Sequence, residues 1–328
     1  MYQMMSLPLY SGTLGEYNSW RDLGQELERL GCDGIEGVWG GEDLPKDLPA
    51  ELILGYHLIF YPDWLDFYRD DRAALKQKVG SREVTASFYG GLGPDTLLEQ
   101  YRADLRRAVN LGARYVVFHV SDVSLEEGYT YRWLHTNQEV IDAAVEVVNL
   151  ILGEERWPFE FLVENQWWPG FTFTEPEETA RLLEGIRFAG KGILLDTGHL
   201  MNACTELKTE AEGADYIRRM LNRHGSLAKW VRGVHLHQSL SGAYVKAHTG
   251  SLPAGLPEDY MERFGVSYQH ILQIDQHRPW TDPAILSVLE QIEPRYLTHE
   301  LSSRGRMARA EAVSVQTRLL QQGGRMRV

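Results

Sequence analysis

Short apolar runs alternate with amphipathic stretches along almost the whole chain of 328 residues. The apolar runs are rich in β-branched and aromatic residues and lack strict polar alternation, as expected of strands buried on both faces of a parallel sheet. Eight strands are predicted, at residues 5–10, 33–37, 52–58, 114–120, 159–165, 192–196, 231–237 and 295–300. This order restricts the chain to a parallel α/β fold, either a closed barrel or an open doubly wound sheet.

Amphipathic stretches between these strands predict helices. The clearest lie at residues 18–31, 96–112, 138–152 and 173–183. Asn18 or Ser19 can cap the first of them, and Gly31 can end it. The last opens with Thr174 and Glu177 at the spacing of a capping box. Strand and helix therefore alternate throughout.

Of the two α/β architectures we expect the barrel. An open dinucleotide-binding sheet needs a glycine-rich phosphate loop after its first strand, and "LYSGTLGEY" lacks the G-x-G-x-x-G spacing. The length suits one (β/α)8 TIM barrel of roughly 250 residues with insertions, so we predict a single domain over residues 1–328. Residues 238–270 are rich in Gly, Ser and Pro and predict a long loop insertion, or lid, after strand seven.

The charge balance limits the partners. With 33 Lys and Arg against 46 Asp and Glu, the net charge is −13, so long nucleic acid is an unlikely partner. The Arg-rich end, residues 302–328, has two interpretations, an anion-binding tail or a solvated terminal helix. Its apolar residues at helical spacing favour the helix: Ala310, Val313, Val315 and Leu319.

Cysteine content and hydropathy bear on the compartment. Cys32 and Cys204 are too few for a disulfide framework, which favours a reducing, cytoplasmic location. No stretch approaches about 18 uninterrupted apolar residues, so we expect a soluble protein without a membrane partner. The sequence does not indicate the oligomeric state.

Ionisable residues lie at the ends of seven of the predicted strands. They are Glu36, His57, His119, Glu164, Asp196, His235 and Glu300. In a TIM barrel the C-terminal strand ends converge on one mouth, where catalytic groups lie. His199 follows Asp196 by three residues, and Asp275 with His277 forms another pair of acid and imidazole. Burying several carboxylates together costs many kcal/mol unless protons or cations compensate, so we predict a metal site.

Each of these residues also has a simpler interpretation. Asp196 can cap backbone amides at a strand-to-helix turn, and a single histidine at a strand end is more often a hydrogen-bonded core residue. Lys246 and His248 either bind a substrate anion or are exposed. Several aromatic residues near the mouth either bind a flat ligand or wall the barrel: Tyr61, Trp64, Trp167, Trp168 and Trp280. Other histidines are assigned surface or structural roles: His135, His224, His270 and His299.

The ordered motifs resemble the xylose isomerase-like TIM-barrel superfamily, which includes sugar isomerases and epimerases and the endonuclease IV branch. The resemblance runs from about Gly31 to Glu300, and its motifs are "GYHLIFY", "GARYVVFHV", "LVEN", "LLDTGH", "GVHLH", "IDQH" and "LTHE". Resemblance to the endonuclease IV branch implies three zinc ions. The first would be bound by His57, His119 and Glu164. The second would be bound by Glu164, Asp196, His235 and Glu300, and the third by His199, Asp275 and His277.

Resemblance to the isomerase branch implies a single metal ion at the second of these sets. Glu164 and Glu300 would then transfer a proton, and Glu36 would contact the substrate. The chain also departs from the endonuclease IV pattern: His237 stands where an Asp is usual, and forty residues separate His235 from Asp275. Together with unrecognisable DNA-binding loops and the acidic charge, these departures argue against repair of abasic DNA.

The favoured hypothesis is a metal-dependent hydrolase that cleaves a phosphoester or similar bond in a small, sugar-containing substrate. Its predicted cofactors are two or three zinc ions, with manganese as the alternative, and its catalytic residues are Glu164, Glu300 and Glu36. Isomerisation of a sugar or sugar phosphate would need only one ion and four of the predicted ligands. It remains the alternative, followed by a non-catalytic barrel that binds metal or sugar.

Overall fold

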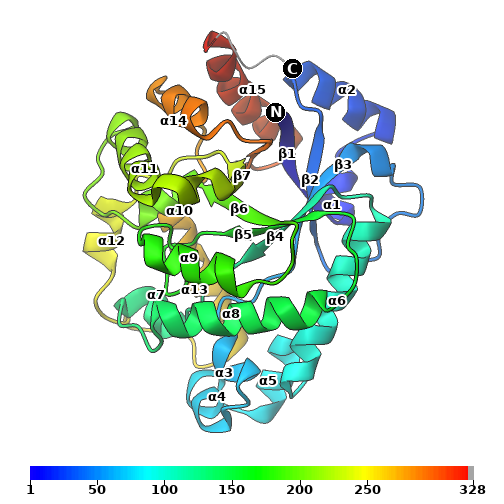
Figure 1. The fold of residues 1–328 in the computed structure, drawn as a ribbon. Coiled ribbons are helices and arrows are strands. Elements are labelled where there is room, and N and C mark those ends of the chain that lie inside the picture. Colours follow the sequence, from blue (N-terminus) through cyan, green and yellow to red (C-terminus); the bar gives the residue numbers. More distant parts are fainter. Residues whose placement is uncertain (324–328) are drawn as a thin grey trace.

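Eight parallel strands close into a barrel surrounded by helices in the computed structural model, which describes residues 1–323 (Figure 1). The strands are β1 (Tyr2–Leu9), β2 (Gly34–Trp39), β3 (Ile53–His57), β4 (Tyr115–His119), β5 (Glu160–Glu164), β6 (Lys191–Asp196), β7 (Val231–His235) and β8 (Tyr296–His299). All eight predicted strands are present, in order. The prediction of a TIM barrel is therefore confirmed, and the open sheet is excluded.

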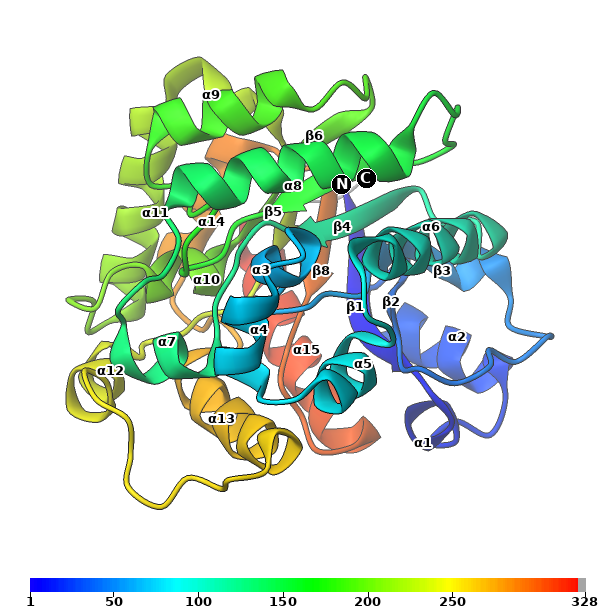
Figure 2. The same ribbon diagram turned by 90° about the horizontal axis from the view of Figure 1, so that it is seen from below.

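Helices flank the strands on the outside of the barrel (Figure 2). They are α1 (Ser11–Leu14), α2 (Trp20–Leu30), α3 (Leu65–Tyr68), α4 (Arg72–Val79), α5 (Arg82–Tyr89), α6 (Pro94–Asn110), α7 (Leu125–Thr130), α8 (Asn137–Leu152), α9 (Pro176–Gly185), α10 (Thr197–Asn202), α11 (Glu210–His224), α12 (Gly242–His248), α13 (Tyr260–Ile274), α14 (Ala284–Ile292) and α15 (Arg306–Gln322). The 3₁₀ helices η1 (Ala50–Leu52) and η2 (Gly225–Trp230) precede β3 and β7.

The predicted helix ends are correct for α2 and wrong for α9. Ser19 accepts a hydrogen bond from the Asp22 amide, and Gly31 ends α2 in the left-handed region at φ 73°. By contrast, α9 has Glu175 at its N-cap without a side-chain cap. The Thr174 hydroxyl instead pairs with the Thr172 hydroxyl at 2.7 Å, so the predicted capping box does not form.

The terminal helix α15 packs one side against the barrel. Ala310, Val313 and Leu319 are buried, whereas Val315 is half-buried. Arg306 is paired with Asp22, so at least one arginine of this end is already neutralised within the protein. Residues 324–328 of the Arg-rich end lie outside the described part of the chain. Among residues 1–323, no helix has the length and apolar character that crossing a bilayer requires.

The strand register decides which side chains meet at the barrel mouth. His119 pairs with Glu164 across β4 and β5, and Asp196 pairs with His235 across β6 and β7. Below this level the interior is filled by a layer of large side chains: Met4, Leu54, Tyr115, Leu162, Leu194 and Tyr296. The barrel is therefore a packed core with polar groups confined to its upper layers.

The segment predicted as a loop insertion contains α12 and the first part of α13. In Figure 2 these helices lie beside α7, and contacts join α13 to both α7 and α12. The chain then returns to the mouth through an antiparallel bridge between Gln238 and Arg278, whose amides and carbonyls pair at 2.8 and 3.1 Å. The insertion is thus a helical cover beside the mouth, and its end lies next to β7.

Gly55 in β3 gives a test of this packing. A Cβ atom at Gly55 would lie 2.2 Å from Cζ of Tyr115, whose hydroxyl donates to Glu36 at 2.6 Å. We expect Gly55→Ala to lower the free energy of unfolding by about 1–3 kcal/mol, because the ring must shift in a filled interior. Urea denaturation followed by far-UV circular dichroism measures the change.

The matched control is Gly24→Ala in α2, where nothing lies within 4 Å of the added Cβ. This substitution should raise the free energy of unfolding by about 0.5–1 kcal/mol, because alanine favours helix. An unchanged denaturation midpoint for Gly55→Ala would contradict the packing described above.

Candidate metal centre

Three groups of potential metal ligands meet at the C-terminal mouth of the barrel. Within each group, one ligand atom from every residue lies within 4.8 Å of those of the others. The groups are His57, His119 and Glu164; Glu164, Asp196, His235 and Glu300; and His199, His237, Asp275 and His277. The structure therefore brings together all nine residues predicted as metal ligands, and it adds His237.

The first group joins the ends of β3, β4 and β5. His57 Nε2 lies 3.0 Å from His119 Nε2, and Glu164 Oε2 lies 3.4 and 3.2 Å from these two nitrogens. His57 Nδ1 donates to the Leu58 carbonyl at 2.8 Å, which leaves a lone pair on Nε2. Glu164 Oε2 is buried and accepts no hydrogen bond in the structure.

The second group lies at the centre of the mouth. His235 Nδ1 is 2.9 Å from Glu300 Oε2, 3.6 Å from Glu164 Oε1 and 3.7 Å from Asp196 Oδ2. Glu164, Asp196 and His235 are fully buried, whereas the Glu300 side chain is 19% exposed. Asp196 also caps α10, because its Oδ1 accepts from the His199 amide at 2.6 Å. The capping interpretation and the ligand interpretation therefore describe the same carboxylate.

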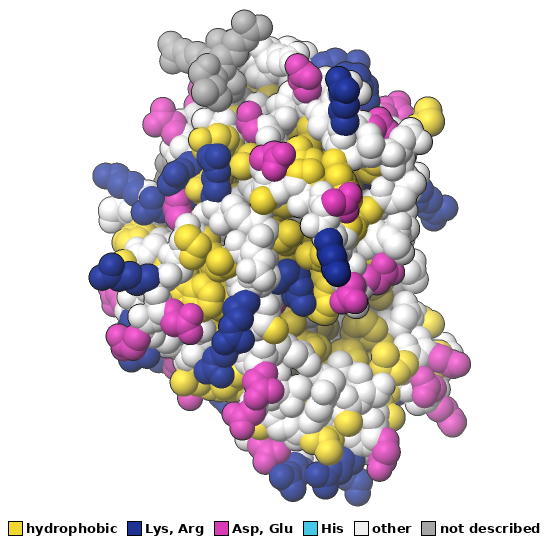
Figure 3. All heavy atoms as spheres, turned by 90° about the vertical axis from the view of Figure 1, so that its right-hand side faces the viewer, with side chains coloured by type: hydrophobic (Ala, Val, Ile, Leu, Met, Phe, Trp, Pro, Cys, Tyr) yellow, Lys and Arg dark blue, Asp and Glu magenta, His cyan; other side chains and the backbone are white. Residues whose placement is uncertain are grey.

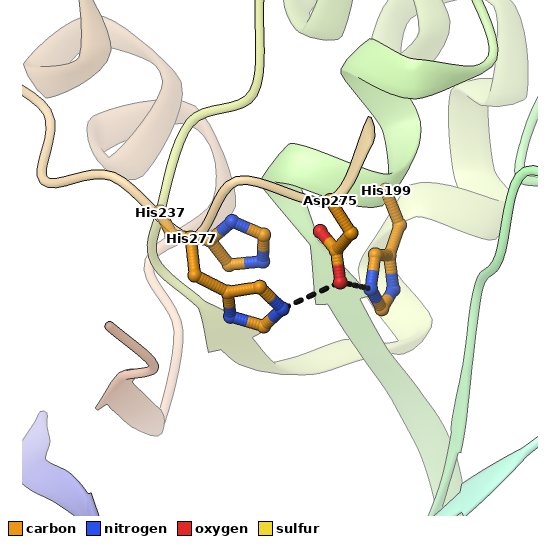
Figure 4. Close-up of side chains that lie close together, drawn as sticks. All are labelled: His199, His237, Asp275 and His277. Atoms are coloured by element: carbon orange, nitrogen blue, oxygen red, sulfur yellow. Dashed lines mark hydrogen bonds and ion pairs between the residues drawn. The ribbon is translucent and has the colours of Figure 1, made fainter. Parts of the chain in front are cut away.

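The third group gathers side chains from α10, the end of β7 and the segment that follows α13 (Figure 4). Asp275 Oδ2 lies between two imidazoles, 3.3 Å from His199 Nε2 and 2.5 Å from His277 Nε2. The His237 ring stacks on the His277 ring at 4.0 Å, and its Nε2 lies 2.8 Å from Asp196 Oδ2.

Gly198 makes room for His237. A Cβ atom at this position would lie 2.1 Å from Cε1 of the His237 ring. His277 is also held in an uncommon conformation, with φ at +45°. Two local features therefore shape the third group: Gly198 has no side chain to obstruct the His237 ring, and His277 has an unusual backbone conformation.

Hydrogen bonds behind the histidines orient their free nitrogens toward carboxylates. His277 Nδ1 donates to the Glu300 carbonyl at 3.0 Å, and His199 Nδ1 faces the Asn165 carbonyl at 3.0 Å. Because a carbonyl oxygen only accepts, each Nε2 then presents a lone pair to Asp275 Oδ2. Two lone pairs facing one carboxylate oxygen repel it unless a proton or a cation lies between them. The donor set therefore fits a divalent ion.

The pKa values describe the same need for positive charge. Burial lowers the pKa of His277, but Asp275 outweighs this effect and raises it to about 10. Burial also lowers the pKa of His199 and His235, but nearby carboxylates outweigh it. Asp196 and Asp275 raise the pKa of His199 well above its ordinary value. Glu300 and Glu36 raise the pKa of His235 in the same way. The neighbouring carboxylates therefore favour the protonated form of these imidazoles. A bound cation would replace those protons.

Glu36 does not lie at a strand end, as the sequence suggested, because β2 continues to Trp39. Glu36 pairs with Gly55 of β3, whereas His57 pairs with Val38. Glu36 therefore lies two residues before the His57 level, deeper in the barrel. Its Oε1 lies 2.9 Å from His235 Nε2. Its Oε2 accepts from the Tyr115 and Thr298 hydroxyls at 2.6 and 2.9 Å. Glu36 is fully buried and orients His235 from behind.

A cavity of about 520 Å³ adjoins the three groups. Among the aromatic residues considered as platforms, it is lined by Tyr61, Trp167 and Trp168. Trp64 and Trp280 do not line it. The Trp64 indole donates to the Ser121 carbonyl, and the fully buried Trp280 indole donates to the His237 carbonyl. These two tryptophans therefore wall the barrel, as the simpler interpretation held.

The remaining histidines take structural or surface positions. His248 is exposed at the end of α12, Lys246 is paired with Glu206 at 2.7 Å, and neither lines the cavity. His224 stacks on Phe173, and His299 lies 2.8 Å from Gln316 Nε2. His135 lies 3.2 Å from Asp66. His270 contacts Tyr244 and also lines the cavity.

Sequence reasoning missed His237 as a potential ligand and the amides that support the centre. His237 was noted only as a departure, although residues two apart at a strand end point to the same side. Asn165 brackets Asp196, since its side chain accepts from the Asp196 amide at 2.8 Å and donates to the Asp196 carbonyl at 3.1 Å. Gln166 Nε2 lies 3.0 Å from His199 Nδ1. Nothing in the sequence distinguishes these amides from ordinary loop residues.

Surface charge is mixed on the face shown in Figure 3. Lys and Arg side chains are interspersed there with Asp and Glu side chains and do not form a continuous basic stripe. Binding of a long polyanion requires such a stripe. This face of the molecule therefore lacks the charge pattern of a nucleic-acid interface.

Comparison with known proteins places this site in a recognised fold family. A family model described as a xylose isomerase-like TIM barrel matches residues 25–313. Endonuclease IV from Thermus thermophilus superposes with a TM-score of 0.54 and 16% identity, covering 98% of this chain and 100% of that chain. A D-tagatose 3-epimerase-like protein superposes with a TM-score of 0.53 and 14% identity, covering 99% of this chain and 98% of that chain.

The IOLI protein, in a structure with a binding zinc atom, gives a TM-score of 0.51 and 16% identity, with coverages of 98% and 98%. Comparison with curated proteins finds no match. At these identities the structural likeness shows the fold, and the names of the neighbours span different reactions. With the family model covering most of its length, the chain belongs to the xylose isomerase-like TIM-barrel family, whose members are mostly enzymes.

Proposed function

We propose that the protein is a divalent-metal-dependent hydrolase that cleaves a phosphoester or similar bond in a small substrate. The observation that carries this proposal is the continuity of the three ligand groups. Glu164 belongs to both the first and the second group, and Asp196 links the second to the third through its 2.8 Å contact with His237. A centre of this kind suits a reaction in which several charges develop close together.

The donor set suits zinc first, because it consists of imidazole and carboxylate, and manganese second. Bound divalent ions supply two things to hydrolysis: they lower the pKa of water, and they stabilise negative charge on a phosphoryl oxygen. Zinc is also named in the structure of the IOLI protein. The sugar component of the substrate, implied by the resemblance, remains a prediction.

The roles of individual residues follow from their burial. Glu164 is fully buried and holds the first and second groups together. Glu300 is part-exposed and lines the cavity, so it can contact a substrate as well as a metal ion. Glu36 does not line the cavity and contacts His235 at 2.9 Å, so it serves to position that imidazole, which is a change from the substrate contact first expected of it.

A single-metal sugar isomerase or epimerase is the second candidate. The group of Glu164, Asp196, His235 and Glu300 is sufficient for it, because one ion polarises the oxygens while two carboxylates move a proton. This reaction would leave the first and third groups without a role. A non-catalytic barrel that binds metal or sugar would not need three linked ligand groups beside the cavity, so hydrolysis is favoured over both.

Removing one imidazole from the first group separates the two reactions. We expect His57→Ala to lower the kcat for hydrolysis of 4-nitrophenyl phosphate by at least about 100-fold, because a metal ligand is lost. Glu300→Gln should cause a comparable loss. Initial rates measured by nitrophenolate absorbance test both variants.

The control is His248→Ala, since His248 is exposed and lies outside the three groups. This variant should keep the wild-type rate. If His57→Ala also kept the full rate, the first group would not take part in hydrolysis and the multinuclear proposal would be wrong.

Glu36→Gln tests the positioning role. The substitution keeps the shape but removes the charge that pairs with His235, so we expect zinc affinity to fall about 10- to 100-fold. Competition with a chromophoric chelator measures the affinity. An affinity equal to that of the wild type would show that Glu36 does not act through His235.

A further inference from the structure

The cavity beside the metal centre extends beyond the ligands into an aromatic chamber. Much of its wall is formed by apolar and aromatic side chains from α7, α13 and the loop after β5: Leu125, Tyr129, Trp167, Trp168, Phe264, Tyr268 and Ile271. The volume of about 520 Å³ lies in the range of pockets that hold a small organic ligand. The phosphoryl chemistry proposed above does not by itself require such a chamber.

The chamber begins at the metal ligands themselves. The Trp167 ring lies 5.0 Å from the His199 ring and 4.1 Å from the Trp168 ring, centroid to centroid. On the opposite side, the Phe60 ring lies 4.4 Å from the His119 ring. A ring attached directly to a phosphoryl group at the metals would therefore enter the chamber.

Some of the polar groups that line the chamber are already paired within the protein. The Ser124 hydroxyl donates to Glu127 at 2.6 Å, and His270 bonds to Tyr244 and to the Gly128 carbonyl. The Gln166 side-chain amide donates to Glu164 Oε1 at 3.4 Å. Neither Lys nor Arg is among the lining residues. The wall is thus largely aromatic and aliphatic, and its described residues offer no lysine or arginine for a second anionic group.

Three donors in the wall of the chamber have no partner among the described residues. They are Nε1 of Trp167, Nε1 of Trp168 and Oγ of Ser267, in residues that are 7%, 8% and 5% exposed. Leaving a buried donor unpaired costs about 1–3 kcal/mol, so each of these groups needs a partner, either ordered water or a bound ligand. The two indoles belong to the loop after β5, and Ser267 belongs to α13, on the helical cover.

We propose that the chamber binds an uncharged planar ring, aryl or heterocyclic, that carries one or two hydrogen-bond acceptors. The ring is the part of the substrate attached to the scissile phosphoryl group, so this inference rests on the proposed hydrolase function. The indole faces and α13 select the ring by stacking and apolar contact, and Trp168 and Ser267 bind its acceptors.

Two phosphonates distinguish binding in the chamber from binding at the metal ions. Phenylphosphonate and methylphosphonate carry the same anionic group, but only the first carries a ring. With zinc-loaded protein, isothermal titration calorimetry should give a Kd at least about tenfold lower for phenylphosphonate, since a ring is buried. Trp168→Ala should reduce this preference to about threefold or less without changing the Kd of methylphosphonate. Trp133→Ala is the control, because Trp133 is exposed and does not line the cavity.

Acetanilide, a neutral planar ring with one amide acceptor, tests the chamber without the metals. Saturation-transfer NMR should detect its binding to the wild type and a loss of binding in Trp168→Ala. Trp168→Phe retains a ring but loses the donor, so it should keep the phenylphosphonate preference and bind acetanilide about three- to tenfold more weakly. This variant also covers the case in which Trp168→Ala fails to fold.

The outcomes distinguish the two proposals. Equal Kd values for the two phosphonates, or a preference that survives in Trp168→Ala, would overturn the ring site and leave the hydrolase intact. If neither phosphonate bound while acetanilide did, the hydrolase proposal would fail and the chamber would remain a site for a planar ring. Absence of acetanilide binding together with equal phosphonate affinities would leave the chamber without this function.

Discussion

The buried carboxylates at the barrel mouth need positive charge, and the rest of the site is arranged around that need. Glu164 and Asp196 are fully buried, and Asp275 is nearly so. An isolated carboxylate transferred from water into such surroundings loses several kcal/mol of solvation even after relaxation. The neighbouring histidines supply the compensation only when they carry protons or share a cation, because their free nitrogens face the carboxylate oxygens directly. A bound cation would therefore offset the free-energy cost of burying these acids.

The strand register of the barrel brings the acids and histidines to the same level. Adjacent strands bring His119 beside Glu164 and Asp196 beside His235, so ligands far apart in sequence stand at one level. The lower layer then serves as a support, with Glu36 fixing His235 from below. The third group requires a different device. The bridge between residues 238 and 278 returns the end of the helical cover to β7, which places Asp275 and His277 opposite α10.

The order of the strands, the barrel and the convergence of acids and histidines at its mouth could be predicted, because each depends on local pattern and on a general rule of the fold. Apolar runs identify strands, and polar residues at their ends converge in any closed parallel barrel. Glu36 was misplaced because the pattern could not show that β2 continues to Trp39. Trp64 and Trp280 appeared as possible platforms because burial depends on long-range packing, which a single sequence does not reveal.

His237 illustrates a second limit. Its position after β7 was visible, but its contact with His277 depends on where the chain returns after α13 and on the space left by Gly198. The insertion was expected to be a loop or lid because of its Gly, Ser and Pro residues, yet α12 and the first part of α13 form within it, and α13 lines the cavity. Both features arise from tertiary contacts between segments distant in sequence, and such contacts override local composition.

Elemental analysis of the native protein, purified without chelators, tests the metal centre most directly. Three linked ligand groups predict between about two and three equivalents of zinc or manganese per chain. A content of one equivalent or less, unchanged after incubation with either metal, would contradict a multinuclear centre at this mouth.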